Sequence, residues 1–326
     1  MTRRHVLLSA ASMIAASVLH AQTPRLRRVA IAATTARDVP NEGIKAFTQR
    51  MAELGWVEGR NIEYVYAYAG GEASRYEPVI AELLASKPDV LFAYFQTMAL
   101  IAKKLTQEVP IVFTISSNPE AVGLVASLAR PGGNVTGAST RAFELDGKRF
   151  ELMREIKPGI QRMAVLVNPN APEIAKRFSE SYAKIASKLG VQFMTVEARS
   201  AEELGSAFDR MAREGVQGVL GTADTGHLYA LRGAVVSNAA RVGIPAMYVD
   251  ERYVEAGGLV SYGTDNLDQM RRGAIYVDKI LRGAKPADLP VEEPTHFHMA
   301  LNLKTARALK IAVPQSVLVR ADQVIE

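Results

Sequence analysis

The chain has 326 residues, of which 48% are hydrophobic and 22% charged, and it carries a formal net charge of +5 with no cysteine. This length favours two domains, and the apolar content excludes an intrinsically disordered or fibrous chain. The lack of cysteine excludes disulfides and lipid attachment through an N-terminal cysteine, and the small, scattered positive charge does not predict nucleic-acid binding.

The first residues are typical of an export signal. Arg3 and Arg4 form a basic start, residues 6–19 are uncharged and mostly apolar, and Ala21 is a small residue suited to cleavage. Because a bilayer span needs about 20 apolar residues, a membrane anchor is the weaker alternative. We expect a signal peptide at 1–21, cleaved near Ala21, and a mature protein in the periplasm that is not membrane-inserted. Both the general and the twin-arginine export route remain open.

From residue 27 onward, strand-like and helix-like segments alternate. The spacing predicts strands at 28–33, 61–68, 90–95 and 111–115, and helices at 41–54, 74–86 and 97–107. Asn118 and Pro119 favour a further helix that would run to Ala129, followed by a strand that leads to Thr140. Such alternation predicts a doubly wound lobe with a parallel sheet.

The same pattern then restarts. We predict a helix at 145–155, strands at 163–167, 192–196, 218–220, 246–249 and 257–263, and intervening helices at 173–189, 201–214 and up to 241. A helix at 267–282, an extended connector, a strand at 296–301 and a short helix at 304–309 break the alternation. The predicted fold class is therefore α/β, with two Rossmann-like lobes that each contain a parallel sheet.

Several long motifs carry a family resemblance. They are LARPGGNVTG at 128–137, GGLVSYG at 257–263 and ILRGAKPADLPVE at 280–292, with shorter matches at 302–306 and 320–322. The chain thereby resembles the ABC transporter substrate-binding proteins of the tryptophan/tyrosine-binding type. The resemblance implies a type I periplasmic-binding-protein fold with a three-crossing hinge, a ligand enclosed between the lobes, and delivery to a membrane permease with its ATPase. We expect a monomer with an N-terminal lobe at 27–140 plus 264–284 and a C-terminal lobe at 141–263 plus 285–326.

In such a fold, ligands bind at the loops beyond the carboxyl ends of the strands. The candidate residues in the first lobe are Thr34, Thr35, Phe95, Gln96, Thr97, Ser116, Ser117 and Asn118, with Thr140 at a crossing. Those in the second lobe are Asn168, Asn170, Thr222, Asp224 and Tyr248, with Tyr262 at the second crossing. Hydroxyls and helix-start amides at Thr97 and Ser116 can hold a carboxylate, Asp224 suits an ammonium, and Phe95 or Tyr262 can stack on a ring.

Each of these residues has a simpler structural alternative. Asn118 and its neighbouring serines could cap a helix, Asp224 could be an N-cap, and Phe95 could belong to the core. The family often carries aspartate at the position of Asn118. A neutral side chain there attracts an ammonium less, so other small carboxylates or neutral molecules remain open as ligands.

Catalytic motifs are incomplete in this sequence. The S-x-x-K pattern at 181–184 lacks a K-T-G partner, and neither G-x-S-x-G nor a Walker loop occurs. His296 and His298 could share a face, but no third histidine lies near them in the sequence. We therefore expect no enzyme, no metal and no cofactor. The predicted function is the solute-binding component of an ABC importer, which closes on an aromatic amino acid or related carboxylate. A periplasmic ligand sensor is the alternative, and a hydrolase comes third.

Overall fold

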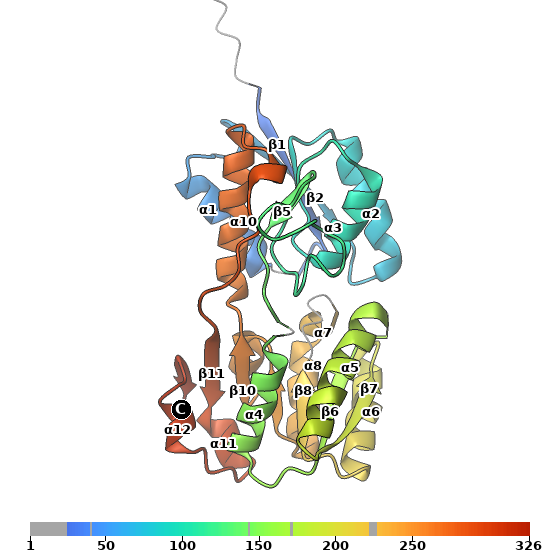
Figure 1. Ribbon diagram of the computed structural model, residues 1–326, viewed down its shortest axis with the longest axis vertical. Coiled ribbons are helices and arrows are strands. Elements are labelled where there is room, and N and C mark those ends of the chain that lie inside the picture. The colour runs from blue at the N-terminus through green and yellow to red at the C-terminus, as the bar shows by residue number, and fades with distance from the viewer. Residues whose placement is uncertain (1–24, 40, 143, 170–171, 222–226) are drawn as a thin grey trace, which may run out of the picture.

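The computed structural model describes residues 25–326 except 40, 143, 170–171 and 222–226. Two α/β lobes are stacked along the long axis of the molecule and are joined by chain segments near its middle (Figure 1). No helix among the described residues is both long and apolar enough to cross a membrane.

The first lobe is built around a parallel sheet. Its strands lie in the order β2 (Ile62–Tyr68), β1 (Arg27–Ala33), β3 (Val90–Phe92), β4 (Ile111–Phe113) and β5 (Val135–Gly137). One face is covered by α1 (Glu42–Glu53) and α10 (Asn266–Leu281), and the other by α2 (Tyr76–Ala85), which follows η1 (Ala73–Arg75), and by α3 (Gln96–Leu105). Because both faces are covered, β1 is a continuous apolar run whose side chains from Val29 to Ala33 are fully buried.

The second lobe contains a longer sheet. Its strands lie in the order β12 (Gln323–Ile325), β11 (His298–Asn302), β10 (Val260–Gly263), β9 (Ala246–Tyr248), β8 (Gly218–Gly221), β6 (Arg162–Val167) and β7 (Gln192–Glu197). Within this sheet β10 and β11 pair antiparallel, and the other pairs are parallel. The predicted α/β fold with two sheets is therefore confirmed, with one antiparallel pair that the sequence did not predict.

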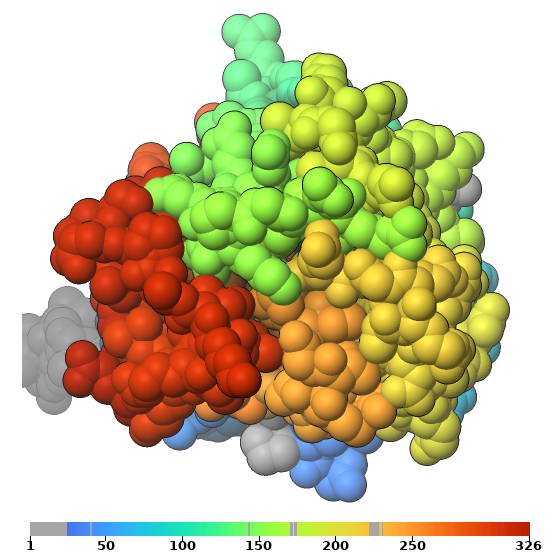
Figure 2. Space-filling model, turned by 90° about the horizontal axis from the view of Figure 1, so that it is seen from below, coloured from blue at the N-terminus to red at the C-terminus, as the bar shows by residue number. Residues whose placement is uncertain are grey.

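Helices cover both faces of the second sheet. One face packs against α4 (Asp146–Ile156), α5 (Pro172–Lys188), α11 (Leu303–Ala308) and α12 (Gln315–Leu318). The other packs against α6 (Ala201–Arg213), α7 (His227–Ala230), α8 (Arg232–Val242) and α9 (Glu251–Glu255). Figure 2 shows the C-terminal residues beside α4, where Arg320 and Ser316 contact Glu155 at 2.5 and 2.7 Å.

The predicted helix from Pro119 to Ala129 is wrong, because this segment forms a series of turns. Asn118 Oδ1 accepts a hydrogen bond from the Ala121 amide at 3.0 Å, as a helix cap would. Gly123 then adopts a φ of 72°, which ends any helix. The next two residues are buried in the core of the first lobe, so tertiary packing decides the path of the chain here.

Three segments join the lobes. The chain leaves the first lobe after β5, returns between β10 and α10, and leaves again before β11. We expected residues 285–326 to lie in the second lobe, but the segment after η2 (Pro286–Asp288) remains on the first sheet. Val291 donates to the Leu128 carbonyl at 2.7 Å, and the Glu292 amide donates to the Gly137 carbonyl at 3.2 Å. Val291 is also buried in the first-lobe core. The third crossing therefore begins after Glu292.

Candidate functional site

A cavity of about 240 Å³ is lined by side chains from both lobes. The first lobe contributes residues that follow the ends of β1, β3 and β4, namely Thr34, Thr35, Tyr94, Phe95 and Ile115, together with Val39, Asn41, Glu42 and Gly43 around the start of α1. The second lobe contributes Tyr229, Arg232 and Arg252 from α7, α8 and α9, and α10 contributes Asn266 and Met270. Parallel strands end at one edge of their sheet, so each lobe presents these loops and helix starts together.

The first-lobe wall is aromatic and carries neutral polar groups. Asn41 caps α1 by accepting from the Ile44 amide at 2.9 Å, and its Nδ2 donates to the Tyr94 hydroxyl at 3.1 Å. Burial raises the pKa of Tyr94 to about 12, against the opposing effect of its hydrogen bond with Asn41. The ring of Phe95 lies 4.5 Å from that of Tyr94, centroid to centroid. This wall therefore offers ring surface with an un-ionised hydroxyl.

The second-lobe wall is cationic. The guanidinium carbons of Arg232 and Arg252 lie 4.8 and 4.9 Å from the centre of the Tyr229 ring, within the range of cation–π attraction. Burial raises the pKa of Tyr229 to about 12, although the positive charge of Arg252 opposes the shift. Arg232 donates to the Tyr229 carbonyl at 3.3 Å, and no carboxylate in the described part of the chain forms an ion pair with it. The wall thus presents a guanidinium that can take an anionic group.

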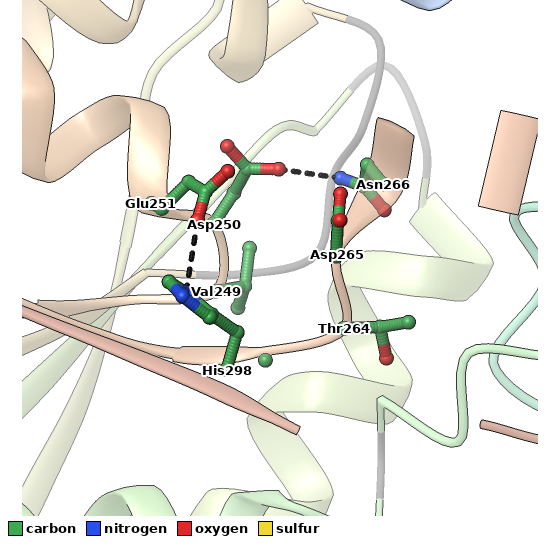
Figure 3. A pocket seen from close by; sticks show the side chains of 8 residues that line it. Val249, Asp250, Glu251, Thr264, Asp265, Asn266 and His298 are labelled. Atoms are coloured by element: carbon green, nitrogen blue, oxygen red, sulfur yellow. Dashed lines mark hydrogen bonds and ion pairs between the residues drawn. The ribbon is translucent and has the colours of Figure 1, made fainter. Parts of the chain in front are cut away.

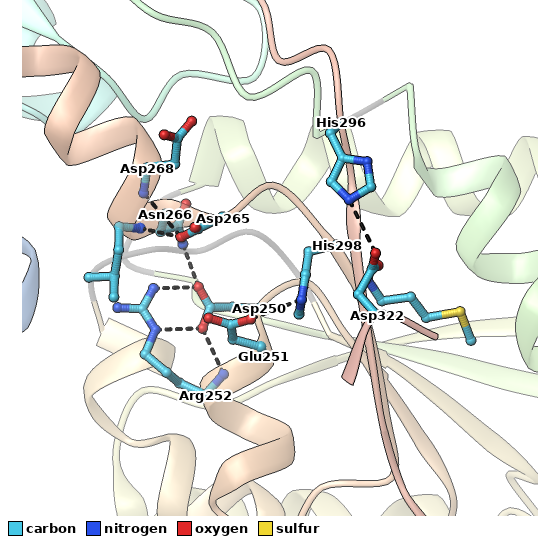
Figure 4. Close-up of polar contacts among 11 residues, drawn as sticks. Asp250, Glu251, Arg252, Asp265, Asn266, Asp268, His296, His298 and Asp322 are labelled. Atoms are coloured by element: carbon cyan, nitrogen blue, oxygen red, sulfur yellow. Dashed lines mark hydrogen bonds and ion pairs between the residues drawn. The ribbon is translucent and has the colours of Figure 1, made fainter. Parts of the chain in front are cut away.

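Arg252 is held by a buried carboxylate. Asp250 is 4% exposed and accepts from Nε and Nη2 of Arg252 at 2.7 and 2.5 Å (Figure 4). Burial by itself would lower the pKa of Arg252, but the hydrogen bonds and charge of Asp250 raise it above its usual value. Arg252 therefore stays charged and fixed in the cavity wall.

A second ion pair lies beside this one, next to the second crossing. Glu251 Oε2 lies 2.9 Å from Nδ1 of His298, and Asp250 accepts from Asn266 Nδ2 at 2.6 Å (Figure 3). Burial raises the pKa of Glu251, while the charge of His298 opposes this shift. Asp265 caps α10 by accepting from the Leu267 amide at 2.7 Å. These acids are each engaged, and they surround the small space drawn in Figure 3.

Of the residues predicted for the site, the cavity is lined by Thr34, Thr35 and Phe95. The hydroxyl of Thr35 is buried and has no hydrogen-bond partner among the described residues, so it is available to a ligand. Asn170, Thr222 and Asp224 lie outside the described residues.

The other predicted first-lobe residues do not line the cavity. The Ser116 hydroxyl donates to Gln96 Oε1 at 2.7 Å, and Ser117 is the next residue in the chain. Gln96 and Thr97 are the first two residues of α3. Asn118 is occupied by its own turn. Thr140 lies in the first crossing, where its carbonyl accepts from the Thr264 hydroxyl at 2.9 Å.

Among the second-lobe predictions that fall on described residues, Asn168, Tyr248 and Tyr262 do not line the cavity. Tyr248 is a core residue whose ring stacks on that of Tyr253 at 4.7 Å. The ring of Tyr262 lies 6.1 Å from that of Phe297, and Asn168 is buried just beyond β6.

Our sequence reasoning missed most of the polar lining. The missed residues are Asn41, Glu42, Tyr94, Tyr229, Arg232, Arg252 and Asn266. A signal existed for one pair, because Tyr229 and Arg232 are three residues apart in a helical region after a strand and so share a face. For Arg252 the signal was its place at a helix start just beyond the end of β9.

Comparison with known proteins identifies the family of this chain. The family model described as "ABC transporter substrate binding protein" matches residues 28–325. A tyrosine-binding protein of Clostridioides difficile (strain R20291) is 24% identical over 288 residues, which cover 86% of this chain and 80% of the relative.

Solved structures share the fold. A conserved domain protein from Vibrio cholerae is 26% identical, with a TM-score of 0.82, over 92% of this chain and 100% of that one. The ABC domain from Streptococcus pneumonia in complex with L-Trp is 24% identical, with a TM-score of 0.81 and the same coverage. The type I periplasmic-binding-protein fold expected from the motifs is confirmed. With the family model matched from β1 to the last strand, the chain belongs to the ABC transporter substrate-binding protein family.

Proposed function

We propose that this substrate-binding protein takes an aromatic amino acid, or a related carboxylate, between its lobes. One observation carries the proposal: a single small cavity joins the rings of Tyr94 and Phe95 in one lobe to Arg232 and Tyr229 in the other. A planar side chain can pack between such rings, and a guanidinium is suited to bind a carboxylate. Relatives named for tyrosine binding and for an L-Trp complex are consistent with this ligand class.

The ligand is oriented by the charges of the two walls. Its carboxylate binds Arg232 in the second lobe, because Arg252 is already neutralised by Asp250. An ammonium would face an acidic residue. Glu42 lines the cavity from the first lobe. In the second lobe, Asp224 is the candidate that the sequence analysis offers for the ammonium.

Binding is coupled to hinge closure in this proposal. A ligand that contacts both walls adds contacts in the closed form that the open form lacks, and it shifts the population by that difference. The three crossings supply the hinge, and the closed form would be presented to a membrane permease with its ATPase. The signal-like residues 1–21 support export to the periplasm, where we propose that the protein acts as a monomer.

The test is the variant Arg232→Met, measured by isothermal titration with L-tryptophan and L-tyrosine. Charge-assisted hydrogen bonds contribute roughly 1.5–3 kcal/mol, so we expect the affinity to fall by about 10- to 100-fold. Arg241→Met is the matched control, because Arg241 lies on the same helix but pairs with Asp209 at the surface. Equal affinities of Arg232→Met and the natural protein would remove this arginine from the site.

A further inference from the structure

Asp250 contacts side chains from both lobes. Its Oδ1 accepts from the backbone amide of Arg252 at 3.0 Å and from Nε at 2.7 Å. Its Oδ2 accepts from Arg252 Nη2 at 2.5 Å and from Asn266 Nδ2 at 2.6 Å. Figure 4 shows this carboxylate between the two donors, close to the second crossing.

The two donors belong to opposite walls of the ligand cavity. Arg252 lies in α9 of the second lobe, whereas Asn266 is the first residue of α10, which packs on the first lobe. Both side chains line the cavity, but Asp250 itself does not. Asp250 therefore lies behind the ligand surface and can act on a ligand only through these two residues.

The neighbouring acids cannot replace it. Glu251 lies 2.9 Å from His298, and Asp265 accepts from the amides of Leu267 and Asp268 at the start of α10. Among the described residues, the carboxylate that forms an ion pair with Arg252 is that of Asp250. Its two oxygens match the forked donors of a guanidinium, an arrangement that fixes direction as well as charge.

We propose that Asp250 is a cross-lobe positioning residue, which fixes Arg252 in one wall of the cavity and Asn266 in the other. The inference rests on the proposed function of the cavity as the ligand site. Because one carboxylate binds both side chains beside a hinge segment, Arg252 and Asn266 keep their position relative to one another when the lobes close on a ligand.

The test is Asp250→Asn, assayed by isothermal titration with L-tryptophan and L-tyrosine. The amide keeps the size of the side chain but loses the charge, and it directs an N–H₂ group at one of the two donors. We expect the affinity to fall by about 10- to 100-fold. Asp265→Asn is the matched control, because Asp265 precedes Asn266 and asparagine caps a helix as well as aspartate does. We expect this variant to bind both amino acids with the affinity of the natural protein.

A double-mutant cycle separates positioning from general destabilisation. If Asp250 acts through Asn266, Asp250→Asn and Asn266→Ala are non-additive, and the double variant binds about as weakly as Asp250→Asn alone. Additive losses would overturn the cross-lobe role, and natural affinity in Asp250→Asn would overturn the proposal altogether. If Asp250→Asn does not fold, Arg252→Lys takes its place, because lysine keeps the charge but cannot bind both oxygens. Natural affinity in that variant would equally overturn the proposal.

A measurement on the ligand-free protein tests the positioning role of Asp250 independently of which ligand the cavity binds. In the ligand-free protein, the Arg252 Nε–H resonance should exchange slowly with solvent, and it should exchange rapidly in Asp250→Asn but not in Asp265→Asn. Rapid exchange in the natural protein would overturn the proposal. A natural protein that binds neither amino acid but shows this protected resonance would contradict the proposed ligand and leave the positioning role supported.

Discussion

At the level of single residues, Glu42 and Asp224 are the two acids proposed to hold an ammonium, and the structure describes the surroundings of Glu42. Glu42 is exposed in the first turn of α1, and an exposed ion pair contributes little, about 0–1 kcal/mol. We therefore expect Glu42→Gln to weaken L-tryptophan binding by less than about fivefold. Asp224→Asn should weaken it by about tenfold or more, as expected for a hydrogen bond to a charged group.

Indole-3-propionate provides the control for this pair, because it keeps the ring and the carboxylate but lacks the ammonium. Its affinity, measured by the same titration, should be unchanged in both variants. The reverse order, with the larger loss in Glu42→Gln, would assign the ammonium to Glu42.

Individual residues also show why the sequence identified only part of the site. Thr34 and Thr35 directly follow β1, and Phe95 lies three residues after β3, a local signal that the chain order carries. Arg252 is oriented by Asp250, and Asp250 also binds Asn266, 16 residues away. Long charged side chains are usually solvated, so the local signals for Arg232 and Arg252 were too weak to assign either side chain to the cavity without the long-range contacts.

At the level of elements, helix α4 fixes the second-lobe ends of two crossings through a buried arginine. Arg149 is 1% exposed, and it donates to the carbonyls of Tyr262 and Ala142, each at 2.8 Å. Ala142 lies in the first crossing, and Tyr262 directly precedes the second. The guanidinium also pairs with Asp146, whose pKa is raised by burial although the arginine opposes the shift.

We expect the double variant Arg149→Met with Asp146→Asn to fold, because replacing both partners avoids an unpaired buried charge. The loss of two hydrogen bonds to the crossings should lower the free energy of unfolding by about 1–3 kcal/mol. It should also widen the distribution of distances between the lobes.

Pulsed dipolar spectroscopy can measure that distribution between spin labels at Glu82→Cys on α2 and Glu202→Cys on α6, since the natural chain has no cysteine. Ser181→Ala is the control, because it removes a hydrogen bond to Asp146 and touches no crossing. A distribution as narrow as that of the natural protein would show that Arg149 does not restrain the hinge.

Helices and strands could be predicted where their apolar residues form a pattern within a short stretch of sequence. β1 from Val29 onward and β6 from Met163 onward are continuous apolar runs, and the alternation of strands and helices predicted the two sheets. The segment 119–129 carries helix-start residues, yet its Leu124 and Val125 side chains are buried in the core of the first lobe. The third crossing was misplaced for the same reason, since the position of Val291 depends on its contact with Leu128.

At the level of the whole molecule, one cavity is shared by the two lobes. Its aromatic wall and its cationic wall belong to different lobes. A ligand that has both a ring and a carboxylate can therefore contact both walls, whereas a ligand with only one of these groups contacts one. The shared cavity thus links ligand chemistry directly to closure.

The most direct measurement is the thermal stability of the purified protein in the presence of L-tryptophan, L-tyrosine and L-phenylalanine, with tryptamine as the analogue that lacks a carboxylate. A ligand at 100 times its Kd stabilises the folded state by about 2.7 kcal/mol. We predict a clear rise in melting temperature with at least one of the amino acids and none with tryptamine. The absence of any shift with all three amino acids, or an equal shift with tryptamine, would contradict the proposal that this cavity binds an aromatic amino acid through its carboxylate.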